Sequence, residues 1–293
     1  MLELRYLSIG IASVAGAATT NANTGGHFGC AVIAAYFLAK EFRLDAATVT
    51  ALRMAMDTMI AGNPTFFPTS PESPPVVDGE QRIVAALEAS IDRFTTIGHN
   101  VIFAALALKA LRERGSAISE HEATGIAAVI RKMNEEGPPQ EIFGMPVSTE
   151  TTPDMVPYAD ERDLATTTIM EAMKLERVYP GGFQGYTCHL LTHGHALIVL
   201  ERLGYRDLAR RGHLPHRLQA AQLCVLHDWT EKRDPLEPLP FSPLEAAFWN
   251  HPFPHMWWGG HVFKYAYHHT SLLALVDPGL RARAIPKIAR MYG

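Results

Sequence analysis

Apolar residues recur along this chain mostly at helical spacing. In residues 46–61, for example, they return every three or four positions, and Asp45 before them is a good N-cap. Sustained two-residue alternation with β-branched residues is almost absent, so strands are not required. The pattern predicts an all-α protein of about a dozen helices, with residues 1–293 in a single domain.

A Gly-His pair leads into an apolar run at four places along the chain. Gly precedes five of the 14 histidines, whereas its ordinary frequency predicts about one such pair. Similarity at a spacing of tens of residues is typical of helical repeats. We therefore expect an α/α toroid or helical-repeat barrel built from four degenerate Gly-His helix units, with each pair at a helix start, although the third helix could begin as early as Tyr186. The four pairs are Gly26-His27, Gly98-His99, Gly194-His195 and Gly260-His261.

Three proline-rich segments interrupt the helical pattern, at residues 62–79, 137–159 and 235–243. Segments of this length without periodicity are usually surface loops, and many are functional. We expect residues 137–159 to form a lid over the mouth of a cavity.

The histidines of the four units are the main candidates for chemistry. If the four helices are the inner ones and point the same way, their histidines meet at one end of the barrel. A helix N-terminus disfavours the imidazolium form, and neutral imidazole binds metals or exchanges protons. On the last helix, Tyr265 and His268 follow His261 by four and seven residues, so the three form one polar column along an apolar helix. On the third helix, Tyr186, His189 and His193 could form a similar column. The predicted catalytic residues are His27, His99, His195, His261, Tyr265 and His268.

A multi-histidine site of this kind favours iron, copper or zinc. We expect His99, His193, His195 and His261 to be the metal ligands, with Asp57, Glu88 or Glu171 as possible carboxylate partners. The histidine spacing matches no short metal-binding motif. His193 and His195 point away from each other on a helix, so the cavity can receive one of them. The alternative interpretation is that the Gly-His pairs are only helix caps.

Aromatic residues are concentrated between Phe241 and Tyr267, interleaved with histidines. This density is typical of a pocket for a flat or apolar organic molecule, although an ordinary aromatic core would give the same pattern. The predicted substrate-binding residues are Tyr186, Trp249, Phe253, Trp257 and Trp258.

Composition narrows the functional class. The net charge is −4 and the basic residues are scattered, so the chain lacks the basic patch of a nucleic-acid-binding protein. Three distant cysteines suggest neither a disulfide framework nor a cysteine-rich zinc site. No apolar run is long enough to predict a membrane span. Residues 7–18 resemble a secretory signal but lack a clearly basic start, so we expect a first helix that is retained, and a cytoplasmic protein.

Two Gly-His segments, GHNVIF at residues 98–103 and GHALI at 194–198, are similar to segments of a known family. They resemble the histidine-containing apolar helices of the questin oxidase-like family, all-helical proteins linked to oxidative ring cleavage of aromatic polyketides. The resemblance implies an oxygen-inserting oxidoreductase that acts on an aromatic substrate. We therefore expect an oxidoreductase of secondary metabolism. The alternatives are a metal-free acid–base enzyme (cyclase, isomerase or hydrolase), a protein that only binds a small molecule or metal, and a scaffold for protein partners.

Overall fold

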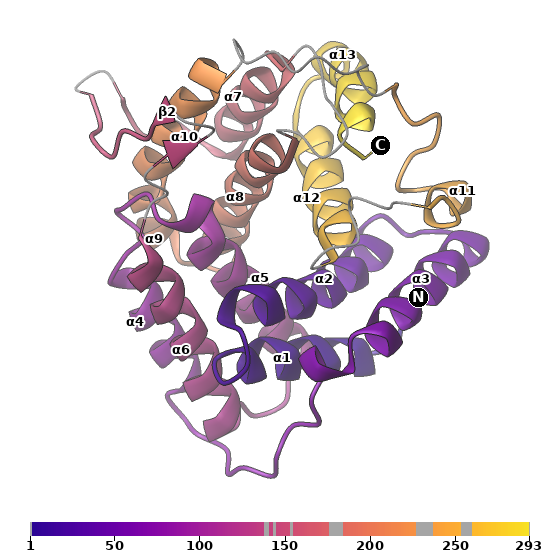
Figure 1. The fold of residues 1–293 in the computed structure, drawn as a ribbon, viewed down its shortest axis with the longest axis vertical. Coiled ribbons are helices and arrows are strands. Elements are labelled where there is room, and N and C mark those ends of the chain that lie inside the picture. The colour runs from indigo at the N-terminus through magenta and orange to yellow at the C-terminus, as the bar shows by residue number, and fades with distance from the viewer. Residues whose placement is uncertain are drawn as a thin grey trace.

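The computed structural model describes residues 2–137, 141–142, 145–152, 155–175, 184–226, 237–252 and 260–292. These residues are mostly helical (Figure 1), so the predicted all-α class is confirmed. A minor exception is one antiparallel pair of two-residue strands, β1 (Glu141–Ile142) and β2 (Met145–Pro146).

The α-helices in chain order are α1 (Arg5–Ala17), α2 (Ala22–Glu41), α3 (Ala46–Gly62), α4 (Gly79–Glu88), α5 (His99–Arg114), α6 (Glu120–Glu136), α7 (Glu161–Met173), α8 (Gln184–Arg202), α9 (Arg206–Arg211), α10 (His213–Leu226), α11 (Ala246–Trp249), α12 (His261–Leu275) and α13 (Pro278–Ala289). Short 3₁₀ turns are η1 (Pro64–Phe66), η2 (Thr96–Gly98) and η4 (Arg290–Tyr292).

Four helices form the centre of the molecule: α2, α5, α8 and α12. Each packs against the next, and α12 packs back on α2, so the four close a cycle. Figure 1 shows them around the middle of the view. Helices α2, α5 and α12 are buried along most of their length, which is expected for helices that are apolar on nearly all sides. These four helices are the ones that carry the predicted Gly-His pairs.

The other helices cover this centre. Helix α1 packs on α2, α5 and α6, while α7, α9 and α10 pack on α8, and α13 packs on α12. Helix α4 lies against α5 and α6, and the short α11 lies against α3. The closed toroid expected from the repeats stays a prediction, because these contacts establish the central cycle and its cover but no ring of repeated units.

Local capping explains several helix starts. The Asp45 side chain accepts a hydrogen bond from the Thr48 amide at 2.7 Å, as its predicted N-cap role requires. Ser119 and Glu122 form a complete capping box at the start of α6. The predicted first helix is also present, as the largely buried α1.

The prediction that every Gly-His pair begins a helix is wrong for two of the four. Gly98 and Gly260 do precede α5 and α12, with φ values of 88° and 66° in the left-handed region that favours glycine. His27, however, lies in the second turn of α2, because Asn21 caps that helix earlier by accepting from the Thr24 amide.

The second exception is Gly194-His195, which lies inside α8. Gly194 is there for close packing, since a Cβ at this position would lie 2.9 Å from His216 Nε2 and 3.0 Å from Thr168 Oγ1. A glycine before a histidine therefore has two different structural roles in this chain. It either begins a helix in the left-handed conformation or allows two helices to pack closely.

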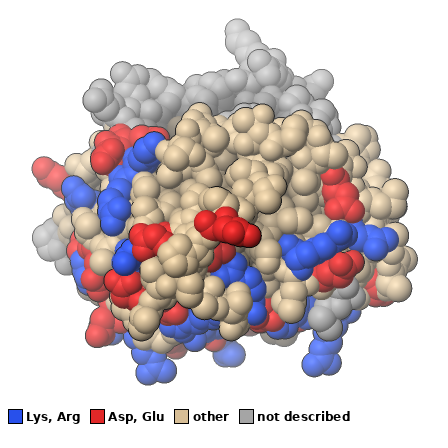
Figure 2. Space-filling model, turned by 90° about the horizontal axis from the view of Figure 1, so that it is seen from below, with Lys and Arg blue, Asp and Glu red and all other residues tan. Residues whose placement is uncertain are grey.

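The surface view in Figure 2 shows Lys and Arg side chains interspersed with Asp and Glu, and neither sign forms a continuous patch on this face. Within the described residues, every helix is too short or too polar to cross a membrane.

Candidate metal centre

A strained turn places His99 at the start of α5. The preceding residues Thr96, Ile97 and Gly98 have φ values of 40°, 50° and 88°. Positive φ is unfavourable for Thr and Ile, so the surroundings must hold this turn in place. Gln219 does so, because its Nε2 donates to the Ile97 carbonyl at 3.3 Å while its Oε1 is 2.8 Å from His193 Nδ1.

Gly98 allows α8 to approach this turn closely. A Cβ at Gly98 would lie 2.6 Å from Cγ of His193, so the imidazole of α8 occupies the space that any other residue would need. The turn, Gly98 and His193 together fix the orientation of the His99 side chain.

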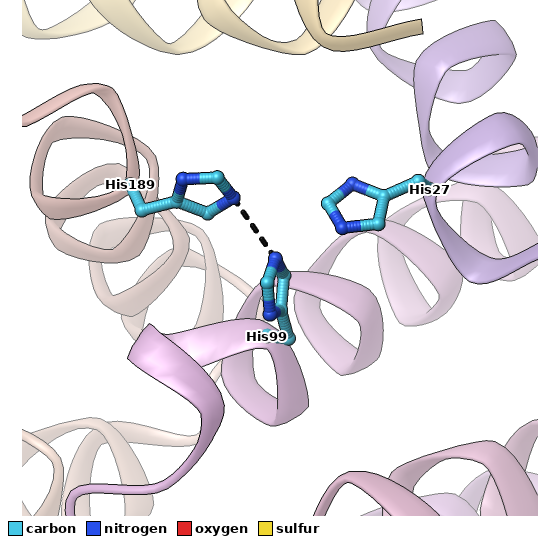
Figure 3. A group of neighbouring side chains, drawn as sticks. All are labelled: His27, His99 and His189. Atoms are coloured by element: carbon cyan, nitrogen blue, oxygen red, sulfur yellow. Dashed lines mark hydrogen bonds between the residues drawn. The ribbon is translucent and has the colours of Figure 1, made fainter. Parts of the chain in front are cut away.

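Three imidazoles from three central helices point toward one another (Figure 3). They belong to His27 of α2, His99 of α5 and His189 of α8, and one ring nitrogen of each lies within 4.8 Å of the other two. The closest pair is His99 Nε2 and His189 Nε2, which are 2.9 Å apart. All three residues are buried, with at most 6% of their surface exposed. Catalytic zinc sites use three protein ligands, and three histidines are one of the ligand sets that occur.

His261 lies beside this group, at the start of α12. Its ring centroid is 4.4 Å from that of His27 and 5.3 Å from that of His189. The structure therefore brings together three of the four Gly-His histidines, His27, His99 and His261.

The outer nitrogens of the group have partners that orient the rings. His189 Nδ1 is 3.2 Å from the Tyr265 hydroxyl, and the backbone of Thr96 hydrogen-bonds His99. His27 Nδ1 contacts the amine of Lys264. Metal-binding histidines usually donate the N–H of the second ring nitrogen to an acceptor, as His99 does to the backbone of Thr96. The Tyr265 hydroxyl can accept from His189 Nδ1 in the same way, whereas Lys264 can accept from His27 Nδ1 only as a neutral amine.

Electrostatics keep this group uncharged. Burial, followed by the neighbouring Lys264 and histidine side chains, lowers the pKa of His27 and of His99 well below the ordinary value. Lys264 is 2% exposed, and burial lowers its pKa to about 7. No carboxylate in the described part of the chain forms an ion pair with Lys264. The site thus presents neutral imidazoles, the form of histidine that binds metal ions.

The other predicted histidines lie elsewhere on the central helices. His195 follows His189 by six residues, which is about 9 Å along the helix and roughly 240° around it. Its Nδ1 is 2.8 Å from Nδ1 of His268, so these two predicted catalytic residues form a separate buried pair. His193 faces α10 through its bond to Gln219. The predicted metal set of His99, His193, His195 and His261 is therefore divided between different parts of the core.

Predicted substrate-binding residues have mixed positions. Trp249 is a core residue, since its indole stacks on Phe263 at 5.3 Å and donates from Nε1 to the Pro243 carbonyl at 2.9 Å. Tyr186 is partly buried in α8. The other three, Phe253, Trp257 and Trp258, lie outside the described residues.

The suggested carboxylate ligands lie outside the three-histidine group. Asp57 accepts a hydrogen bond from the Tyr6 hydroxyl at 2.8 Å, and Glu171 pairs with Lys174. Glu88 is exposed at the end of α4.

Two members of the site were missing from the predicted catalytic and metal sets, His189 and Lys264. His189 had a usable signal, because it lies four residues before His193 and shares its side of the helix. Lys264 had a weaker one, a single charged residue in the apolar run of α12, three positions after His261.

Comparison with known proteins finds no matching family model, no similar curated protein and no similar solved structure. The resemblance to questin oxidase-like proteins therefore stays a resemblance of a few short Gly-His segments. The arrangement itself can hold a cation through three imidazoles, or transfer protons between neutral nitrogen bases.

Proposed function

We propose that this protein is a metal-dependent enzyme in which His27, His99 and His189 hold one iron, copper or zinc ion. The observation that carries the proposal is the convergence of three buried, outwardly hydrogen-bonded imidazoles from three different helices. Three such ligands leave coordination positions for water or substrate, as catalytic metal sites require.

The spacing of the nitrogens supports a shared ion. Ligands bound at about 2.0–2.1 Å lie roughly 2.9 Å apart at right angles and roughly 3.3 Å apart in a tetrahedron. The 2.9 Å between His99 and His189 is within this range, although a direct hydrogen bond has the same length. His27, within 4.8 Å, would need to close by about 1.5 Å, which small side-chain rotations provide.

We further propose an oxidoreductase that acts on a small apolar or aromatic molecule. This part rests on the resemblance of residues 98–103 and 194–198 to oxidative ring-cleaving proteins. Iron or copper at the histidines would supply the redox chemistry, and His261 beside them is placed to accept or donate a proton.

One observation favours a metal-free acid–base enzyme as the second candidate. The Lys264 amine contacts His27 Nδ1 in the buried site, and burial lowers the pKa of this amine to about 7. An amine with a pKa of about 7 can accept or donate a proton at neutral pH without any metal.

Metal analysis of the purified chain separates these candidates. The wild type, His189→Gln and His213→Gln are expressed in medium that contains iron, copper and zinc, and their metal content is measured by mass spectrometry. His213 is the matched control, because it is a histidine of low exposure that accepts a hydrogen bond from the Tyr158 amide, away from the group. Circular dichroism verifies that each variant is folded.

We expect about one ion per chain in the wild type and in His213→Gln, and a large loss in His189→Gln. Iron or copper would support the oxidoreductase, whereas zinc would overturn it and leave a metal-dependent enzyme without redox chemistry. A folded wild type that binds none of these metals would overturn the metal centre and favour the acid–base enzyme.

A further inference from the structure

A second feature of the molecule is an apolar cavity of about 370 Å³ beside α12 and α13. Its apolar wall is formed mainly by Phe241, Leu244, Leu273, Ile285 and Ile288. A cavity of this size is near the lower end of small-molecule sites, about 300–1,000 Å³, and is too narrow for a helix of about 10 Å diameter.

One wall of the cavity carries a buried polar pair. The Tyr292 hydroxyl and His269 Nδ1 are 3.0 Å apart, and both residues are at most 3% exposed. Burial lowers the pKa of His269 to about 3 and raises the pKa of Tyr292 well above its ordinary value. The pair therefore offers hydrogen bonding but no charge at physiological pH.

The charged residue of the lining, Arg281, is already engaged. Its guanidinium donates to the carbonyls of Leu273, Ala274 and Val276 at the end of α12, at 2.6, 3.1 and 3.3 Å. A cation at a helix C-terminus is stabilised there by the helix dipole. No acidic residue lines the cavity within the described part of the chain. A cationic ligand would therefore find no counter-ion in the described lining, and an anionic ligand would have to compete with the three carbonyls for the Arg281 guanidinium.

We infer that this cavity binds an uncharged, largely apolar small molecule with one polar group that hydrogen-bonds the His269–Tyr292 pair. The site does not depend on a metal at the three histidines. It is adjacent to them, since the Tyr265 ring stacks on His269 with centroids 5.4 Å apart while its hydroxyl bonds His189.

Two fluorescent probes with the same ring system test the charge requirement. N-phenyl-1-naphthylamine is neutral and has one N–H group, and 1-anilinonaphthalene-8-sulfonate adds a sulfonate to the same framework. Each is titrated into the full chain in the presence of a chelator, so the outcome does not depend on metal binding. We expect saturable binding of the neutral probe at one site, and at least about tenfold weaker binding of the sulfonate.

Cavity-filling variants locate the binding. Leu273→Trp and the rim variant Ile285→Trp are expected to weaken binding of the neutral probe at least about tenfold, because the indole occupies the cavity. Ile285 is 50% exposed, so its variant is expected to fold even if Leu273→Trp does not. Met170→Trp on α7 is the matched control, since Met170 is 54% exposed and does not line the cavity.

Tyr292→Phe keeps the cavity shape and removes one hydroxyl, so we expect a several-fold loss of affinity for the neutral probe. Equal affinity for the two probes, or binding that neither tryptophan variant weakens, would overturn the proposed site. Unchanged affinity in Tyr292→Phe would overturn the role of the polar pair.

Discussion

Mild acid should destabilise this protein strongly, because its core contains many neutral histidines. Five of them are fully buried and lie outside the proposed metal ligands. Their partners are neutral groups such as Gln219, Tyr158 and Tyr292, or another histidine. The five are His193, His195, His216, His268 and His269.

The direction follows from the pKa values. Burial lowers the pKa of His193 to about 4 and that of His269 to about 3, and it holds the pKa of the other three well below 6.5. The unfolded chain, with ordinary histidines, therefore binds more protons below pH 6.5 than the folded chain. Stability is retained above that pH and is lost as the pH falls below it.

Between pH 6.5 and 5.5, each such histidine reduces the free energy of unfolding by about 1 kcal/mol. Five of them reduce it by about 5 kcal/mol, which is comparable to the whole stability of many domains, about 5–15 kcal/mol. We expect the protein to unfold, or nearly so, by about pH 5, earlier than acid unfolding that is driven by carboxylates alone.

Urea unfolding followed by circular dichroism at pH 7.5, 6.5 and 5.5, in the presence of a chelator, measures this loss. His121→Gln is the control, because it removes a histidine that is partly exposed on α6 and not buried in the core. A change of less than about 1 kcal/mol between pH 6.5 and 5.5 would refute the neutral, buried state of these histidines.

Three further variants test the site and its surroundings. Gly98→Ala combines a positive φ with a steric clash against α8, so it should lower the free energy of unfolding by about 3 kcal/mol, measured by urea unfolding. Its control, Gly115→Ala, has a φ of 70° but open space around it and should lower this free energy by only about 1–2 kcal/mol. Lys264→Met should raise the free energy of unfolding at pH 7 by roughly 4 kcal/mol in chelator. It should also remove the rise in stability that Lys264 gives the wild type between about pH 7 and 8.5, below the range in which the buried cysteines oppose it; a less stable variant would contradict this. Tyr265→Phe removes the hydroxyl beside His189 Nδ1 and should weaken metal binding about 10- to 100-fold in a competitive chelator titration, and an unchanged affinity would show that the hydroxyl does not orient the ligand.

The sequence allowed the helical class and part of the site to be predicted. His27, His99 and His261 were found because each follows a glycine and lies on an apolar helix, and the four Gly-His helices do form the central cycle. Two of them, His99 and His261, have equivalent positions, since each is the first residue of its helix after a left-handed glycine.

Which other residues reach the site depends on how each helix is rotated and packed in the core. A single sequence does not determine this rotation. The third helix carries histidines at positions 189, 193 and 195, and its rotation in the core decides which one reaches the site. His189 was missed because Gly194 marks a close helix contact rather than a helix start. Lys264 was missed because the burial that makes its amine unusual is a tertiary property.

X-ray absorption spectroscopy of the metal-loaded chain tests the central claim most directly, because it counts the atoms bound to the ion. Coordination by His27, His99 and His189 predicts three imidazoles at about 2.0–2.1 Å, with oxygen or nitrogen atoms in the remaining positions. A sulfur shell, or fewer than two imidazoles around the ion, would contradict a metal centre built from these histidines.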